Sequence, residues 1–223
     1  MRVHGSWDGG SYGAVRRLVQ LAALLFLSFS APVLAADRLV LAFGDSLTAG
    51  YGLKPAESYP VRLEAALRGA GIAAKVHNGG VSGETTASGR ARLSWQLQGL
   101  KTKPDLVILE LGANDMLRGL DPGLARANLD AMLTELKRRR ILVLLTGMLA
   151  APNLGAPYRR RFDAIYPALA RKHGVAFYPF FMRGVAGNPR LLQPDGLHPT
   201  ARGVTMIVRG LLPQVKTALA AAR

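Results

Sequence analysis

The sequence of 223 residues contains no cysteine. A disulfide, a thiolate nucleophile and a lipid attached through a thiol are therefore excluded for this chain. The lack of cysteine is compatible with an exported, oxidising location.

Acidic and aromatic residues are also scarce. The chain has 14 Asp and Glu against 29 Lys and Arg, a net charge of +15, and only 7% of its residues are aromatic. A basic chain can bind nucleic acid, but here the basic residues are scattered. The densest run, at 137–140, closes a predicted helix, where cations suit the helix dipole. We expect no nucleic-acid partner, while attraction to anionic membrane lipid or to acyl substrates stays open.

A long hydrophobic run occurs only near the start. Two arginines precede the apolar tract 18–29, and small residues stand at 33 and 35. This pattern predicts a signal peptide at residues 1–35, cleaved after Ala35, and an exported domain at 36–223, periplasmic or secreted. The alternative is an uncleaved anchor. A spanning helix needs about 20 apolar residues, however, and Gln20, two serines and Pro32 interrupt this one.

The remaining sequence alternates short apolar runs with longer helical patterns, which is typical of an α/β domain with a parallel sheet. Hydrophobic residues make up 49% and charged residues 19%, which suits one globular domain. Strands are predicted at 39–43, 74–77, 106–111, 141–146 and 175–178. We expect a single three-layer sandwich in which helices cover both faces of a five-stranded sheet of order 2-1-3-4-5.

Helices are predicted between these strands. The clearest begins at Asp121, which can cap it, and Pro122, which fits a first helical turn. Its apolar residues recur at helical spacing through Leu136. Further helices are expected at 58–68, 86–97, 162–173 and 200–219.

Polar, glycine-bearing segments come directly after the first three strands. Ser46 lies in FGDSLTAGYG after the first, NGGVSGE at 78–84 follows the second, and GAND at 112–115 follows the third. In a sheet of the expected order, these loops lie side by side at the carboxyl edge, where ligands bind. Ser46 is then either a nucleophile or only a turn residue, since Gly, Asp and Ser all favour turns.

A serine nucleophile needs a base, and histidine is the usual one. Of the four histidines, His4 lies in the predicted signal peptide, His173 at a helix end and His77 at a strand end. His198 is better placed, because Asp195, three residues earlier, can orient its ring. The connection after the fifth strand can reach Ser46. Three strand spacings amount to about 15 Å, and extended chain covers about 3.3 Å per residue.

Acyl transfer also needs donors to an anionic oxygen. The candidates are the backbone N–H groups of Ser46 and Gly83 and the side-chain amide of Asn114. Gly83 can instead be a plain turn residue, and Asn114 a helix cap.

Other residues at this edge have simpler interpretations. Asp45 and Asp115 are interpreted as caps, with a direct catalytic part as the less favoured alternative. Met148 and Leu149, after the fourth strand, line an acyl pocket or pack in the core.

Together GDSL at 44–47, Gly83, GAND and DGLH at 195–198 resemble the SGNH subgroup of the GDSL esterase/lipase family. The resemblance covers about 39–215, and its closest kin are secreted bacterial arylesterases and multifunctional thioesterase/lysophospholipase enzymes. It implies a flavodoxin-like sheet, a triad of Ser46, Asp195 and His198, and an oxyanion hole from Ser46, Gly83 and Asn114. Many family members have a second glycine or another small residue before the asparagine. This chain has Ala113 at that position, a mild departure.

The residues favour a carboxylic ester hydrolase that acts on a small acyl ester, as a monomer and without cofactor or metal. A metallo-phosphoesterase is poorly supplied with ligands, and an α/β-hydrolase lacks its glycine two positions after the serine. A carbohydrate O-deacetylase and a silent lipid- or glycan-binding module on the same scaffold remain alternatives.

Overall fold

The structure is a computed structural model that describes residues 1–5 and 37–221. The chain divides into Met1–Ala36 and Asp37–Arg223, and the helices and strands described below belong to the second part. The predicted signal peptide at 1–35 lies outside the described residues except for its first five, so it stays a prediction.

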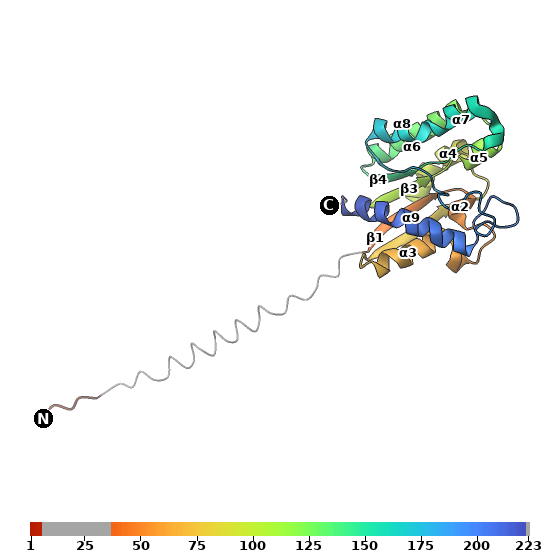
Figure 1. Cartoon of the computed structure of the whole chain (residues 1–223). Helices are drawn as coiled ribbons and strands as arrows, with labels where there is room; N and C mark the ends of the chain where they lie inside the picture. The colour runs from red at the N-terminus through yellow and green to blue at the C-terminus, as the bar shows by residue number, and fades with distance from the viewer. Residues whose placement is uncertain (6–36, 222–223) are drawn as a thin grey trace. The chain divides into compact units, whose positions relative to one another are not determined.

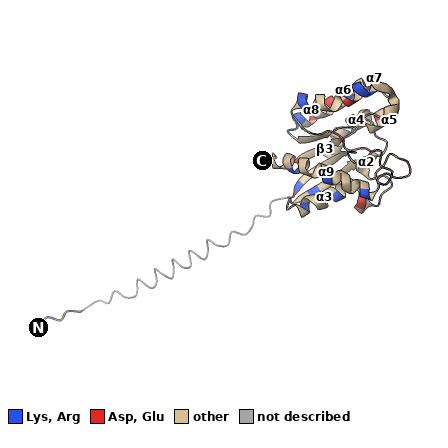
Figure 2. Cartoon of the chain, in the orientation of Figure 1, with Lys and Arg blue, Asp and Glu red and all other residues tan. Residues whose placement is uncertain are grey.

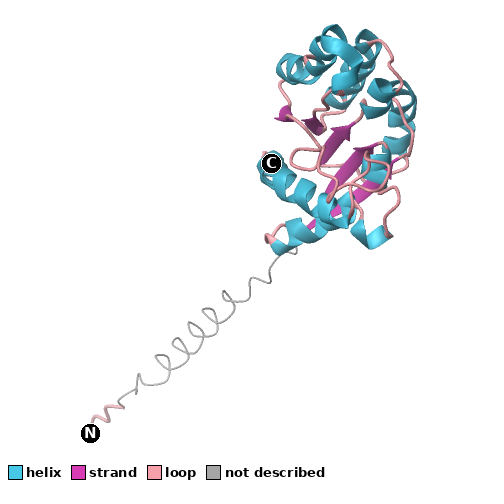
Figure 3. Cartoon of the chain, turned by 45° about the vertical axis from the view of Figure 1, so that its right-hand side comes forward, coloured by secondary structure: helices cyan, strands magenta, loops and turns pink. Residues whose placement is uncertain are grey.

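A five-stranded parallel sheet forms the centre of this part (Figure 3). The strand order β2-β1-β3-β4-β5 confirms the predicted topology. All five strands overlap their predicted positions: β1 (Arg38–Gly44), β2 (Ala74–Gly80), β3 (Leu106–Glu110), β4 (Leu142–Thr146) and β5 (Ala176–Tyr178). Strand β2 extends further than predicted because Gly79 and Gly80 pair with the end of β1.

Helices cover both faces of the sheet (Figure 1), as expected from its apolar strands. One face carries α3 (Tyr59–Gly69) and α9 (Ala201–Ala220), which pack against each other. The other carries α4 (Thr86–Gln98), α6 (Pro122–Arg138) and α8 (Ile165–His173). Shorter elements occupy the connections: α2 (Ser46–Ala49), α5 (Ala113–Leu117), α7 (Gly155–Asp163), and 3₁₀ turns at Pro55–Glu57 and Pro152–Leu154.

Helix α6 forms as its sequence predicts. The Asp121 side chain accepts a hydrogen bond from the Gly123 N–H at 2.6 Å, and Pro122 occupies the first turn. Its apolar stripe is buried, and Arg138 lies in its last turn. The basic run at 137–140 thus lies partly at the end of α6. Figure 2 shows Lys and Arg distributed over helices of both layers.

The predicted helix at 162–173 is wrong in one respect, because the chain forms α7 and α8 with Ala164 between them. Pro167 explains the break. Proline has no N–H to donate to the carbonyl of Asp163, four residues earlier, and its ring clashes with that carbonyl.

Across the described residues, none of the helices has both the length and the apolar character that a bilayer crossing requires.

Candidate active site

Ser46 stands where β1 turns into α2, at the carboxyl edge of the sheet. Asp45 caps this short helix, since its Oδ1 accepts from the Leu47 N–H at 3.0 Å, which confirms its predicted capping role. The turn packs tightly against the neighbouring strand, because a Cβ on Gly80 would collide with the backbone of Ala49. Ser46 is thereby held at the start of α2 and lines a pocket.

The long connection after β5 brings His198 to Ser46. The His198 Nε2 lies 2.8 Å from the Ser46 Oγ, across 152 positions of sequence. The His198 Nδ1 lies 2.6 Å from the Asp195 Oδ2. The predicted serine, histidine and aspartate are therefore brought together in hydrogen-bond contact.

Asp195 is arranged to remain charged. Its Oδ1 accepts from the backbone N–H groups of His198, at 3.0 Å, and Leu197, at 2.9 Å. These backbone bonds, followed by the contact with the His198 ring, lower the pKa of Asp195 to about 2. A carboxylate facing Nδ1 favours the tautomer with its proton there, which leaves Nε2 free to accept the serine proton.

Sequence reasoning missed Tyr51, whose ring lies against the His198 ring with centroids 4.6 Å apart. The Tyr51 carbonyl accepts from the Gln193 side-chain amide at 2.8 Å, which ties the loop after α2 to the His198 loop. The sequence showed Tyr51 inside the first polar segment but gave no sign of the contact with the distant Gln193.

Gly83 lies in the turn after β2. The Glu84 N–H donates to the Val81 carbonyl at 3.2 Å, and Gly83 has φ 79°, a left-handed conformation that suits glycine. The Arg118 Nη2 donates to the Gly83 carbonyl at 2.9 Å. Within the described part of the chain, the N–H groups of Gly83 and Ser46 donate to no other protein group, and both residues line the pocket.

Asn114 also lines the pocket, but its amide is engaged. The Asn114 Nδ2 donates to the Asp45 Oδ2 at 3.1 Å and to the Glu84 carbonyl at 3.0 Å. A substrate oxygen would have to share or displace one of these acceptors. Asp115, the next residue, accepts from both the Thr86 N–H and its hydroxyl, so it caps α4 rather than its own helix.

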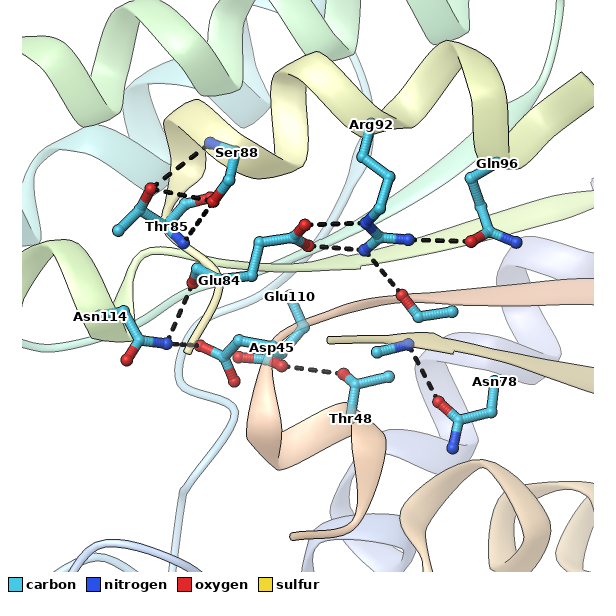
Figure 4. Close-up of polar contacts among 12 residues, drawn as sticks. Asp45, Thr48, Asn78, Glu84, Thr85, Ser88, Arg92, Gln96, Glu110 and Asn114 are labelled. Atoms are coloured by element: carbon cyan, nitrogen blue, oxygen red, sulfur yellow. Dashed lines mark hydrogen bonds and ion pairs between the residues drawn. The ribbon is translucent and has the colours of Figure 1, made fainter. Parts of the chain in front are cut away.

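A buried polar layer lies beneath these residues (Figure 4). The Thr48 hydroxyl donates to the Glu110 Oε2 at 2.8 Å. Burial, and then the charge of Asp45, raise the pKa of Glu110 well above its ordinary value. Burial also raises the pKa of Asp45 to about 6, although the Leu47 N–H, His198 and Asn114 lower it. Glu110, an acidic residue at the end of the apolar run in LVILELG, was the one sequence signal of this layer.

The pocket has a volume of about 590 Å³. Met148, which is buried, and Leu149, which is exposed, both line it. Sequence reasoning missed further apolar lining residues, among them five from α5 and the loop after β5: Met116, Leu117, Phe180, Met182 and Leu192.

His77 and His173 do not line the pocket. His77 contacts the Gln96 side chain at 3.2 Å, and His173, at the end of α8, contacts the Asp130 Oδ1 at 2.6 Å. Among the residues the structure covers, no three His, Asp or Glu side chains are grouped as a metal ion would require.

The model of the GDSL-like lipase/acylhydrolase family matches residues 42–205. The chain belongs to this family.

Members with described activities are similar over most of their length. An arylesterase of Vibrio mimicus is 41% identical over 179 residues, 80% of this chain and 88% of that protein. Esterase TesA of Pseudomonas aeruginosa is 36% identical over 185 residues, 83% of this chain and 91% of that protein. The predicted enzyme class, a GDSL-type carboxylic ester hydrolase, is confirmed at the level of the GDSL-like family.

A solved structure of AlinE4, an SGNH-hydrolase family esterase, has 54% sequence identity and a TM-score of 0.72. It covers 83% of this chain and 98% of its own. AlinE4 has also been solved as two variants, in which a serine or an aspartate is replaced by alanine.

Proposed function

We propose that the chain hydrolyses acyl esters through an acyl-enzyme on Ser46. The 2.8 Å contact between the Ser46 Oγ and the His198 Nε2 carries this proposal. Nε2 takes the hydroxyl proton as Oγ attacks the ester carbonyl, and Asp195 stabilises the resulting imidazolium. The imidazolium then protonates the leaving group. In the second half, Nε2 activates a water, which releases the acid and restores Ser46.

The oxyanion hole is assigned to the N–H groups of Ser46 and Gly83 and to the Asn114 amide. Ser46 and Gly83 support this assignment most directly, because their N–H groups are free and both residues line the pocket. Asn114 contributes when the developing oxyanion, a stronger acceptor than the neutral Glu84 carbonyl, takes over one of its two hydrogen atoms.

The AlinE4 variants are consistent with these roles. The serine and the aspartate replaced in that chain lie as far apart in its sequence as Ser46 and Asp195 do here.

The substrate class is an acyl chain on an oxygen or sulfur leaving group, including aryl, thio and lysophospholipid esters. The pocket is lined largely by apolar side chains, which suits acyl groups better than the sugar of a carbohydrate O-deacetylase. A silent binding module is the weaker alternative, because it would leave the contact between Ser46 and His198 without a role.

We further propose that the chain acts after export and meets anionic membrane lipid through its positive charge. The support is the predicted signal peptide and the net charge of +13 that remains once residues 1–35, with three arginines and one aspartate, are subtracted from +15.

The test compares the wild-type chain with Ser46→Ala on a short chromogenic ester. We expect hydrolysis to fall by at least about 10⁴-fold, as for loss of a triad serine. The control is Ser94→Ala. Ser94 lies on α4, its hydroxyl accepts a hydrogen bond from Arg139, and it does not line the pocket. Wild-type activity of Ser46→Ala would contradict the proposal. A panel of oxygen and sulfur esters of increasing acyl length would then define the substrate.

A further inference from the structure

Arg92, on α4, makes a dense set of polar contacts (Figure 4). Its Nε and Nη2 donate to the two carboxylate oxygens of Glu84 at 2.8 and 2.5 Å. Nη2 also donates to the Gly79 carbonyl at 2.9 Å, and Nη1 to the Gln96 side chain at 2.8 Å. The guanidinium lies 4.2 Å from the centre of the Phe43 ring.

This ion pair is more buried than the others in the described residues. The side chains of Arg92 and Glu84 are 16% and 4% exposed, whereas those of Arg138 and Glu135 are 70% and 26% exposed. Burying a carboxylate is costly even when it is paired, so a buried pair is weak evidence for stability alone. Its location therefore points to a local role.

Glu84 contacts the segments that carry two of the proposed oxyanion donors, the Gly83 N–H and the Asn114 amide. Its N–H closes the turn onto the Val81 carbonyl, which sets the conformation of Gly83. Its own carbonyl accepts from the Asn114 amide at 3.0 Å. A shift of the Glu84 backbone would move both donors together.

We propose that Arg92 is a positioning residue for the oxyanion hole, holding Glu84 so that the Gly83 N–H and the Asn114 amide stay aligned. The bidentate contact restrains the Glu84 side chain, and the guanidinium balances its negative charge close to where the oxyanion develops. The role rests on the proposed esterase function.

Lysine cannot reproduce it fully, because an ammonium lacks the planar fork that engages both carboxylate oxygens. The variants for the test are therefore Arg92→Met, Arg92→Lys and Glu84→Gln. The last of these leaves the guanidinium only one side-chain oxygen at position 84 to donate to. The matched control is Arg138→Met, which breaks an exposed pair with Glu135 on α6.

For each folded variant, kcat and KM are measured on a short soluble ester, together with the affinity of a boronic acid that forms a tetrahedral adduct on serine. We expect Arg92→Met to lower kcat on the order of 10²-fold with KM nearly unchanged, as misplacement of a reacting geometry does. Boronic acid affinity should weaken in parallel, Arg92→Lys should be intermediate, and Arg138→Met should match the wild type.

A folded Arg92→Met with wild-type kcat, or one changed in KM alone, would overturn the positioning role and leave the esterase function standing. If the Arg92 variants do not fold, Glu84→Gln decides: a lower kcat with weaker boronic acid binding supports the role, and a wild-type kcat overturns it. A wild-type chain that hydrolyses no ester would overturn the esterase function and the positioning role together.

Discussion

The loop that carries Asp195 and the polar layer beneath Ser46 hold carboxylates in opposite environments. The Asp195 side chain is 35% exposed, and backbone N–H groups lower its pKa to about 2. Asp45 is 1% exposed, and burial raises its pKa to about 6. Glu110, equally buried, is shifted further in the same direction. Both regions lie at the same edge of the sheet, so burial and hydrogen-bond donors, rather than residue type, set their charge.

This difference fits what each region has to do. A permanent negative charge beside His198 favours the imidazolium that forms during attack. Negative charge beneath the oxyanion hole would oppose the developing oxyanion, and there burial raises the pKa of Glu110 and of Asp45, while Glu84 is paired with Arg92.

Removing the charge of Asp195 should have the largest effect on activity. Asp195→Asn keeps the size of the side chain but no longer fixes the histidine tautomer, and kcat should fall by about 10⁴-fold, as in a comparable triad. Steady-state kinetics on a short ester measure it. Asp130→Asn is the matched control, because Asp130 contacts His173 at the same 2.6 Å distance outside the pocket. Equal activity of the two variants would contradict the role of Asp195.

Removing one oxyanion donor, the Asn114 amide, should have the second largest effect. Asn114→Ala should lower kcat by about 10²–10³-fold with little change in KM, the usual effect of removing one oxyanion donor. Asn128→Ala, which removes an amide bonded to the Thr86 hydroxyl and not part of the pocket lining, serves as the control. If kcat stays at the wild-type value, the Asn114 amide remains with Asp45 and Glu84 throughout the reaction.

The buried layer makes a smaller, pH-dependent prediction. Because the folded pKa of Glu110 lies above 4.5, the folded chain keeps a proton there that the unfolded chain releases, and the free energy of unfolding falls as pH rises from 4.5 towards the folded pKa. Glu110→Gln cannot titrate. Relative to the wild type, this variant should gain stability as pH rises above 4.5, as measured by denaturant unfolding at each pH. A difference that does not vary with pH would mean that Glu110 is ionised in the folded chain.

A half-buried carboxylate away from the site, Glu135, should show the opposite sign and the smallest effect. Arg138 and Arg139 lower the pKa of Glu135 to about 2 through hydrogen bonds. Its contribution is present above the ordinary pKa of 4.5 and is lost as pH falls towards 2. Glu135→Gln should cost less than about 1 kcal/mol at neutral pH, because such pairs are well solvated. A larger loss in the same unfolding experiment would show that the pair is more than a surface contact.

The strands and the main site residues could be predicted from the sequence, because each follows a simple pattern. Apolar runs marked the strands, and the polar segments that follow them contained Ser46, Gly83 and Asn114. The helix break at Ala164 could also have been predicted, since Pro167 was visible. The contact between Arg92 and Glu84 could not, because an arginine and a glutamate eight positions apart near a helix start usually lie in solvent. The structure shows that this pair is buried and that the guanidinium lies over the Phe43 ring.

Labelling with a fluorophosphonate, followed by mass-spectrometric mapping of the modified peptide, tests the contact between Ser46 and His198 most directly. The account predicts one adduct, on Ser46, formed at the wild-type rate in Asp130→Asn and far more slowly in Asp195→Asn. An adduct on a different serine, or ester hydrolysis that persists in Ser46→Ala, would contradict it.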